Sequence, residues 1–512
     1  MRGENPAISL PFRHRPTSPL RIRAAAEAGA TGTVALGALN GFLWRVLIIV
    51  LPVTDFSLVS KAKSFGQLST VPIILLWILL IPAMFKGALR PVIKNRAIQF
   101  LLAFWFVCAG SVLLTAKAPP SFWARENPWL KSISQFLQVS CICSVALFTA
   151  LFVKTWKDFR TALNCYFVGF VLTVLGGLLE LTDFYAGNDW TQAAMGFIHT
   201  FGGRQYLTSS FRLQLLGLEP SWAADYLLCV VPFFVLSTYY WRSRLFSTAC
   251  SVISFLMFLG AASLGGMIAL LGEIAAALAF LRRRTAAIFA ISLLFPALLV
   301  FIFDPEPMAW LVDRARGIMT SGRDTEDFSA RQRTASAETA LNSFKAHPLT
   351  GVGIGVSYFY GLQSIPDWAV RDPMTRYMYK TGDETSFTVN NLFAVILAET
   401  GAVGFLPFVL MLVSMLRGTL RAYRNAAAPW KKRVCGSVFV ILVGQIIHFM
   451  TVSNWSLRYW PFIWGLAIFL ARPGVVSESP APPTAPRSFT VRRRTLTAGS
   501  SRPAFEKEPA ST

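Results

Sequence analysis

The chain has 512 residues, of which 54% are hydrophobic and only 14% are charged, against about 25% charged residues in an average soluble protein. A soluble chain of this length would form two or more domains and would need more polar surface to cover them. Apolar runs of about 20 residues recur along the sequence, and each is long enough to cross a hydrocarbon core of about 30 Å. The composition therefore excludes a soluble enzyme, a disordered protein and a collagen-like fibre. It predicts a polytopic membrane protein.

We predict an all-α fold with about twelve transmembrane helices, because the hydrocarbon core offers no partners for the backbone N–H and C=O groups of other structures. A large, partly helical outward loop separates spans nine and ten. The predicted spans cover approximately residues 34–53, 69–85, 97–115, 133–153, 161–181, 221–240, 246–263, 265–281, 286–303, 389–416, 434–451 and 458–471.

The formal net charge of +22 would favour a nucleic-acid partner in a soluble protein, but its distribution here indicates membrane orientation instead. When the polar segments are assigned alternately to the two faces, one set holds 30 Lys and Arg against 5 Asp and Glu. The other set holds 16 of each. Basic residues collect on the cytoplasmic side of membrane proteins and attract anionic lipid. We therefore expect both termini in the cytoplasm, membrane lipid as a partner, and no nucleic acid.

This topology gives three regions along the chain. Residues 1–33 form a basic cytoplasmic N-terminus, and residues 34–471 form the transmembrane bundle with outward loops at 182–220 and 304–388. Residues 472–512 are rich in Pro, Ser, Thr and Arg, a composition typical of disorder. We expect them to form a disordered cytoplasmic tail.

The seven cysteines lie within or beside apolar runs, and the sequence has no C-x-x-C pair. They are therefore expected to be small buried hydrophobic residues rather than disulfide partners or metal ligands. The outward segments hold neither a His/Cys cluster nor a D-x-D motif. We expect no metal and no other cofactor.

The long loop 304–388 contains a predicted helix with two arginines. Ser329 and Gln332 have the spacing of a capping box, and the helix should end at His347 because Pro348 disfavours helical geometry in the residue before it. Arg331 and Arg333 are about 200° apart around a helix, so they point in different directions. We favour Arg333 as the one that faces the bundle.

Two further motifs follow this helix. The segment Gly351–Gly355 has the wrong spacing for a dinucleotide fingerprint and is expected to be a turn with tight backbone geometry. Asn390 and Asn391 then open an apolar helix that contains Glu399. Because ionisable residues in spans are costly and usually face the protein interior, Glu399 is expected to be a structural anchor.

Other ionisable residues in the spans leave two interpretations open. Glu180, Asp225 and Glu273 are either polar contacts within the bundle or members of a proton path. His448 lies near the outer boundary of a span and is expected to be a hydrogen-bonded or exposed histidine.

Taken in order, three groups of residues resemble motifs of the O-antigen ligase/polymerase superfamily of bacterial inner-membrane glycosyltransferases. The resemblance covers about residues 200–410. The first group is Ser210–Arg212 with Gly217–Ser221, the second is Arg333 with His347–Gly353, and the third is Asn390 and Asn391 with Glu399, Gly401 and Gly404.

The resemblance implies a metal-independent, inverting glycosyltransferase that polymerises or ligates oligosaccharides carried on polyprenyl diphosphate. The reaction takes place at the periplasmic face during exopolysaccharide, O-antigen or capsule assembly, and other assembly proteins are further partners. A polymerase is favoured over a ligase. Arginine suits such a site because its planar guanidinium stays charged and binds phosphate oxygens in pairs. The implied catalytic residues are Arg212, Arg333 and Asn390, the substrate-binding residues are Arg331, Glu219, His347, Asn391 and Arg204, and the structural residues are Glu399, Gly401 and Gly353.

Asn390 stands where the family usually has a histidine that is proposed to act as the base. An asparagine side chain can orient a hydroxyl group but cannot accept its proton near neutral pH. Either another group is the base, with Glu219 and His347 as candidates, or proton removal does not limit the rate, or activity is lost or altered.

Two other classes of function remain open. A transporter or flippase for lipid-linked oligosaccharides should show internal repeats or interrupted helices, and we find no repeat in the sequence. A non-catalytic assembly partner is the second alternative, because of Asn390.

Overall fold

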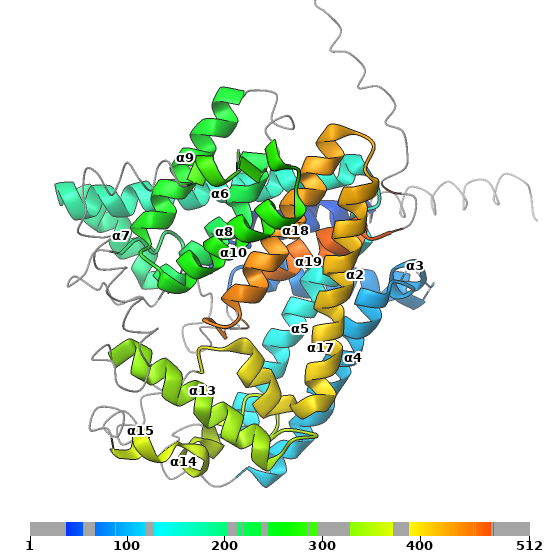
Figure 1. Cartoon of the computed structure of the whole chain (residues 1–512), viewed down its shortest axis with the longest axis vertical. Helices are drawn as coiled ribbons and strands as arrows, with labels where there is room; N and C mark the ends of the chain where they lie inside the picture. The colour runs from blue at the N-terminus through cyan, green and yellow to red at the C-terminus, as the bar shows by residue number, and fades with distance from the viewer. Residues whose placement is uncertain are drawn as a thin grey trace, which may run out of the picture. The chain divides into compact units, whose positions relative to one another are not determined.

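The computed structural model describes a set of ranges that together carry the helical bundle and part of the outer loop (Figure 1). The regular elements in these ranges are helices, and none of the described residues lies in a strand. The prediction of a helical membrane protein is confirmed. The described residues are 37–54, 67–85, 87, 89–118, 127–202, 212–217, 219–236, 244–284, 286–287, 289–293, 328–371, 389–453, 455, 457–472 and 475.

Among the described residues, four helical segments are long and apolar enough to cross a membrane. They are Arg96–Lys117, in which α4 (Arg96–Ser111) continues into the 3-10 helix η1 (Val112–Lys117), α5 (Pro128–Phe152), α6 (Trp156–Ala186) and α17 (Leu392–Asn425).

The other apolar helices in the described ranges have fewer than 18 residues, except α18, which has 20 and coincides with the predicted span 434–451. The total of about twelve spans stays a prediction, and the ninth span, 286–303, lies partly outside the described residues. These helices are Gly37–Val50, α2 (Thr70–Phe85), α8 (Pro220–Leu236), α9 (Arg244–Gly260), α10 (Leu264–Phe280), α18 (Pro429–His448) and α19 (Tyr459–Leu470).

Helix α18 is central to the packing, because it contacts α8, α10, α17 and α19. Helix α19 also packs against α5, and every one of its twelve residues is buried. The aromatic rings of Trp460 and Trp464 both pack against Phe449, which follows α18. The core of the bundle therefore forms where α18 and α19 meet.

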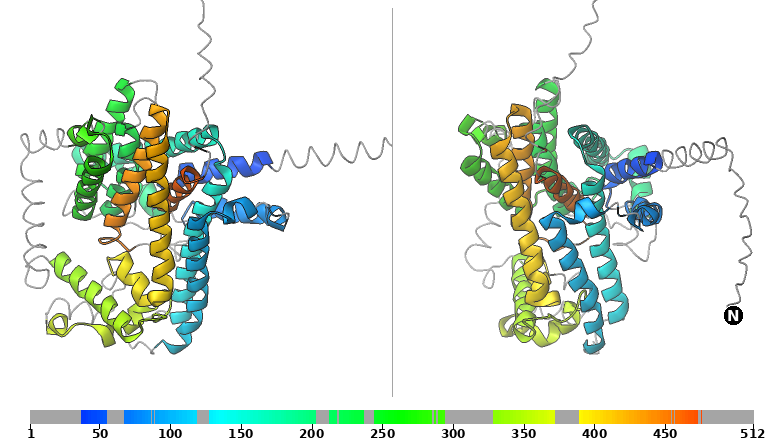
Figure 2. Two further views of the ribbon diagram at one scale, coloured as in Figure 1. Left: turned by 45° about the vertical axis from the view of Figure 1, so that its right-hand side comes forward. Right: turned by 90° about the vertical axis from the view of Figure 1, so that its right-hand side faces the viewer.

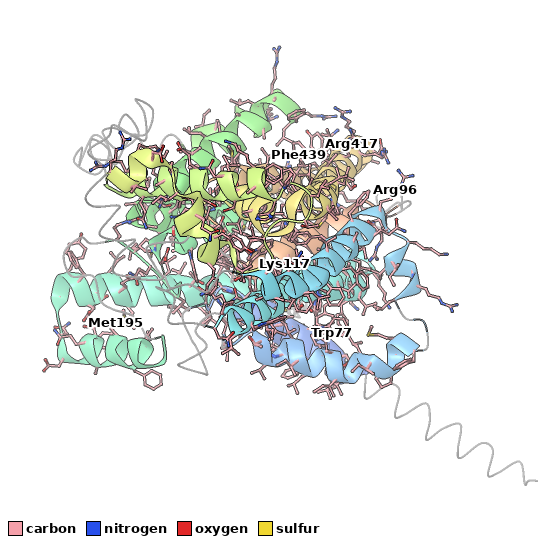
Figure 3. All side chains as sticks on the ribbon, turned by 90° about the horizontal axis from the view of Figure 1, so that it is seen from below. Trp77, Arg96, Lys117, Met195, Arg417 and Phe439 are labelled. Atoms are coloured by element: carbon pink, nitrogen blue, oxygen red, sulfur yellow. The ribbon has the colours of Figure 1, made fainter. Side chains whose placement is uncertain are left out.

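Helices α4 and α17 lie side by side in opposite directions (Figure 2). Phe104 packs against Phe408 with ring centroids 5.3 Å apart, and a Cβ on Gly404 would lie 3.2 Å from Val107. This antiparallel register brings Arg96 to the level of Arg417. Both arginines are exposed and lie at the edge of the packed helices in Figure 3.

The described part of the outer loop is partly helical, as predicted. It contains α13 (Phe328–Ala346), η2 (Ser357–Tyr360), α14 (Gly361–Ser364) and α15 (Asp367–Arg371). Helix α13 ends within one residue of the predicted His347. The loop 182–220 also contains a helix, α7 (Asp189–Gly202).

The predicted span 389–416 is not one continuous helix. Gly401 breaks α17 with φ 60° and ψ −164°, a backbone region that is almost exclusive to glycine. The break separates a short first segment, Leu392–Thr400, from the long second segment of α17. Average hydropathy does not detect such a break, because α17 remains apolar overall even though Glu399 and Thr400 directly precede Gly401.

Candidate functional site

Helix α13 packs along the first segment of α17. Ala340 of α13 forms a buried cluster with Ala394 and Ala398. Further along both elements, the N–H of Ala402 donates to the carbonyl of Pro348 at 2.9 Å. Both contacts join residues 54 positions apart, so α13 and this segment run in the same direction with small side chains between them.

This register brings Arg333 and the Asn390–Asn391 pair to the same end of the two helices. Arg333 lies about 10 Å along α13 before Ala340, and Asn390 lies about 6 Å before Ala394 at 1.5 Å per residue. Arg333 and Asn390 are both half-buried. The sequence motifs that are 57 positions apart are therefore neighbours in the fold.

Asn391 has a structural task at this end. Its side-chain oxygen accepts a hydrogen bond from the N–H of Ala394 at 3.0 Å, which caps the N-terminus of α17. The N–H of Leu392 donates to the carbonyl of Phe449 at 2.7 Å. The beginning of α17 is thus tied to the end of α18.

Arg212 lies on a short segment that closes the turn between α9 and α10. Its Nε donates to the carbonyl of Ala261 at 3.3 Å, and its Nη2 donates to that of Ala262 at 3.0 Å. A cation suits this position, because the carbonyl groups beyond the end of a helix carry partial negative charge. This structural role is in addition to the one that the sequence predicts.

The segment that carries Arg212 is itself held by the buried carboxylate of Glu180 on α6. That carboxylate accepts hydrogen bonds from the backbone N–H groups of Gln214 and Leu215, the latter at 2.9 Å. Leu215 has φ 57°, an uncommon conformation for a residue with a side chain. Its backbone conformation is held by this bond and by the buried packing of its side chain.

The α9–α10 turn also meets the end of α18. A Cβ on Gly265, at the start of α10, would lie 2.5 Å from the Oγ1 of Thr451 and 3.5 Å from the Nε2 of His448. The segment of Arg212, the start of α10, the end of α18, the start of α17 and α13 therefore form one continuous set of contacts. This set is the candidate site.

A buried acid–histidine pair belongs to the helices beside this candidate site. The Nδ1 of His448 is 2.6 Å from the Oδ1 of Asp225 on α8, and both side chains are at most 1% exposed. The indole N–H of Trp460 donates to the other carboxylate oxygen of Asp225. From the sequence, Asp225 is expected to be a polar contact within the bundle or a member of a proton path, and His448 to be hydrogen-bonded or exposed, but their pairing across 223 positions is not predicted.

The glycine-rich segment Gly351–Gly355, called the glycine clamp below, is hydrogen-bonded to the end of the first segment of α17. Gly351, Gly353 and Gly355 all have positive φ. The N–H groups of Val352 and Gly353 donate to the carbonyls of Ala398 and Glu399 at 2.8 and 2.9 Å. The segment thus fills the break in α17, where a residue larger than glycine would not fit at Gly351.

Glu399 is buried at this clamp. Its carboxylate accepts a hydrogen bond from the hydroxyl of Ser357 at 2.8 Å, and the backbone N–H groups of Gly355 and Ser357 also bond to it. These contacts lie at the C-terminal end of α13, away from Arg333.

The remaining predicted residues are spread over the outer surface. Arg331 is half-buried one turn or less from Arg333, whereas Glu219 is exposed and accepts a hydrogen bond from Ser221 at 3.1 Å. His347 is exposed against Tyr360, and fourteen helical residues place it about 21 Å along the axis from Arg333. Arg204 lies outside the described residues.

Six of the seven cysteines are buried and one is half-buried, all as free thiols. Within the described ranges, no group of three or more His, Cys, Asp or Glu side chains could hold a metal ion.

Residues 249–409 match a family model described as O-antigen ligase. The matched range contains most of α9, all of α10 and α13, and the first segment of α17, with Arg333 and Asn390 among its residues. No curated protein matches the chain. The match confirms the resemblance to the O-antigen ligase/polymerase superfamily, whose members act in polysaccharide assembly.

Proposed function

From this resemblance we propose that the protein is a bacterial inner-membrane glycosyltransferase that polymerises, or ligates, oligosaccharides carried on polyprenyl diphosphate. The observation that carries the proposal is the parallel register of α13 on α17, since it gathers Arg333 and Asn390 at one end of the bundle. A polymerase is favoured over a ligase, and other polysaccharide-assembly proteins are its further partners.

The proposed role of the arginines is to stabilise the departing diphosphate. When the bond between the sugar and the diphosphate breaks, negative charge grows on the phosphate oxygens. A guanidinium group held in place before the reaction stabilises that charge without reorganisation. Arg333 meets this requirement, because the alanine contact and the glycine clamp fix α13 at two points. Arg212 is held in place by Ala261 and Ala262, and Arg331 and Arg204 are further substrate-binding candidates.

The proposed role of Asn390 and Asn391 is to position the acceptor. Asn390 can orient a sugar hydroxyl group for attack on the anomeric carbon from the side opposite the diphosphate, which inverts that carbon. The reaction needs no metal, because the leaving group is already a stabilised anion. Glu219 and His347 are assigned to the outer binding surface, with Glu399, Gly401 and Gly353 as its structural support.

The proposed orientation places the site at the periplasmic face. Arg96 and Arg417 lie level with each other near the other ends of α4 and α17, and basic residues favour the cytoplasmic side. Gly401 is sixteen residues from Arg417, about 24 Å along the helix. The regions 1–33 and 472–512 are then cytoplasmic, and the bundle 34–471 carries the outward loops.

A transporter for the same lipids is the second candidate, since the break in α17 is an interrupted helix. In transporters, such breaks expose backbone groups that bind the substrate or an ion. Here the carbonyls of Ala398 and Glu399 already accept hydrogen bonds from Val352 and Gly353. The break therefore serves the attachment of the outer loop and favours the transferase.

The deciding experiment uses the full-length protein in lipid nanodiscs with a polyprenyl-diphosphate oligosaccharide as both donor and acceptor. We expect longer glycan chains and release of polyprenyl diphosphate, and at least about a hundredfold slower release for Arg333→Ala, the usual effect of removing one charge-stabilising group. Arg417→Ala, an exposed arginine at the opposite end, is the matched control and should keep full activity. Lipid movement across vesicles without diphosphate release would favour the transporter instead.

A further inference from the structure

The buried pair of Asp225 and His448 is held from several helices. Asp225 comes from α8 and His448 from the last turn of α18, while Trp460 of α19 donates to the carboxylate. One turn before His448, Gln445 donates to the Sγ of Cys229 at 3.2 Å and accepts from Trp464 at 3.2 Å. The imidazole is therefore oriented by Asp225, whose carboxylate is itself held by Trp460.

The two nitrogens of this imidazole face different surroundings. Nδ1 faces the carboxylate of Asp225, whereas Nε2 faces the first turn of α10, where Gly265 has no side chain. In a carboxylate–histidine pair, the nitrogen beside the carboxylate carries the proton, and the other nitrogen is left as the base. The basic nitrogen of His448 thus faces the turn that Arg212 closes.

His448 is also next to the acceptor side of the site. The residue after it, Phe449, accepts the hydrogen bond from Leu392 at 2.7 Å, and Asn390 comes two positions before Leu392. Glu219 and His347, the other candidate bases, are both exposed. His347 is moreover at the far end of α13 from Arg333.

We propose that His448, oriented by Asp225, is the base that removes the proton from the acceptor hydroxyl group, a role that Asn390 cannot perform. This inference rests on the proposed function. The O–H bond breaks and its proton moves to Nε2, while the oxygen forms a bond to the anomeric carbon. The bond from that carbon to the diphosphate breaks, and its electron pair leaves with the diphosphate. The imidazolium, stabilised by Asp225, then gives its proton to water.

A Cβ at Gly265 would lie only 2.5 Å from the Oγ1 of Thr451, so this contact is closed in the structure, and the start of α10 has to move away from the chain after α18 before the acceptor reaches Nε2. His448 is fully buried in the structure, so the hydroxyl group has to enter between the start of α10 and the chain after α18. The groups beside Nε2 on that path are small, because one is a glycine and the other is a threonine.

The test compares transfer and donor binding in nanodiscs for the full-length protein and its variants. His448→Gln keeps an N–H that can reach Asp225 but lacks a basic nitrogen. We expect its transfer rate to fall about 10² to 10⁴-fold, while binding of the lipid-linked donor is retained. Asp225→Asn should also slow transfer. Asp158→Asn, which changes a carboxylate in the capping box at the start of α6, is the matched control and should be fully active.

Chemical rescue separates a base from a packing group. In His448→Ala, added imidazole should restore transfer at least tenfold, whereas pyrrole, a ring of the same size without a basic nitrogen, should not. Equal rescue by both rings, or transfer by folded His448→Gln within about threefold of wild type, would overturn the role of His448 and leave the proposed function standing. If the unaltered protein releases no diphosphate, the proposed function fails, and the inference fails with it.

Discussion

Ser357 donates a hydrogen bond to Glu399 over 2.8 Å, and this bond fastens the outer loop to the first segment of α17. The two residues are 42 positions apart in the sequence. Glu399 is buried and Ser357 is half-buried, so the bond is partly shielded from water. The position of α13, and with it Arg333, depends on this attachment.

Removing the hydroxyl group by Ser357→Ala should destabilise the protein by about 1–3 kcal/mol, because a buried acceptor loses a hydrogen-bond partner. The midpoint of thermal unfolding in detergent measures the change. Thr182→Ala is the comparison variant, since the hydroxyl of this half-buried threonine bonds to the carbonyl of Leu178 within its own helix. A loss equal to that of the comparison variant would show that Ser357 does not hold the loop.

Gly401→Ala should destabilise the protein by about 3 kcal/mol or more, the upper end of the usual cost of a strained backbone region. Alanine rarely adopts the backbone angles found at Gly401, and its Cβ would overlap the backbone of Leu349 and come within 2.6 Å of the nitrogen of Gly351. Yield and unfolding midpoint in detergent are the measurements. Gly110→Ala, on α4 with nothing within 4 Å of its Cβ, should be neutral or stabilising, and a similar loss in both would refute the strain at Gly401.

Arg212→Lys should impair both stability and transfer. The guanidinium reaches the carbonyls of Ala261 and Ala262 with two nitrogens, and a lysine has a single nitrogen on a flexible chain. We expect a loss of about 1 kcal/mol in the free energy of unfolding and at least a tenfold slower release of diphosphate. Wild-type stability together with wild-type transfer would remove Arg212 from the site.

Asn390→His should keep or raise transfer activity, because it restores the residue that the family usually has at this position. The rate of glycan elongation in nanodiscs is the measurement. The same change in the His448→Gln background should restore part of the lost rate, since the new imidazole would stand at the acceptor side of the site. Loss of transfer by Asn390→His in otherwise unaltered protein would show that the site is built around an amide.

Local chemistry made several features predictable. The low charge and recurring apolar runs predict a helical membrane protein, and Pro348 predicts the end of α13. Arg333 and Asn390 could be singled out by their order and spacing before their neighbourhood was known. By contrast, the break at Gly401 lies within an apolar run, and the twelve buried residues of α19 give no sequence signal of what they contact.

The sequence by itself determined that this chain lies in a membrane and which of its segments are helical, because hydrophobic content and backbone restrictions are properties of neighbouring residues. Only the tertiary structure decided that Arg333 and Asn390 share one end of the bundle and that Asp225 meets His448. Those pairs are 57 and 223 positions apart, and their contacts depend on how helices pack. Packing follows from the fit of many small side chains across different elements, which no local pattern contains.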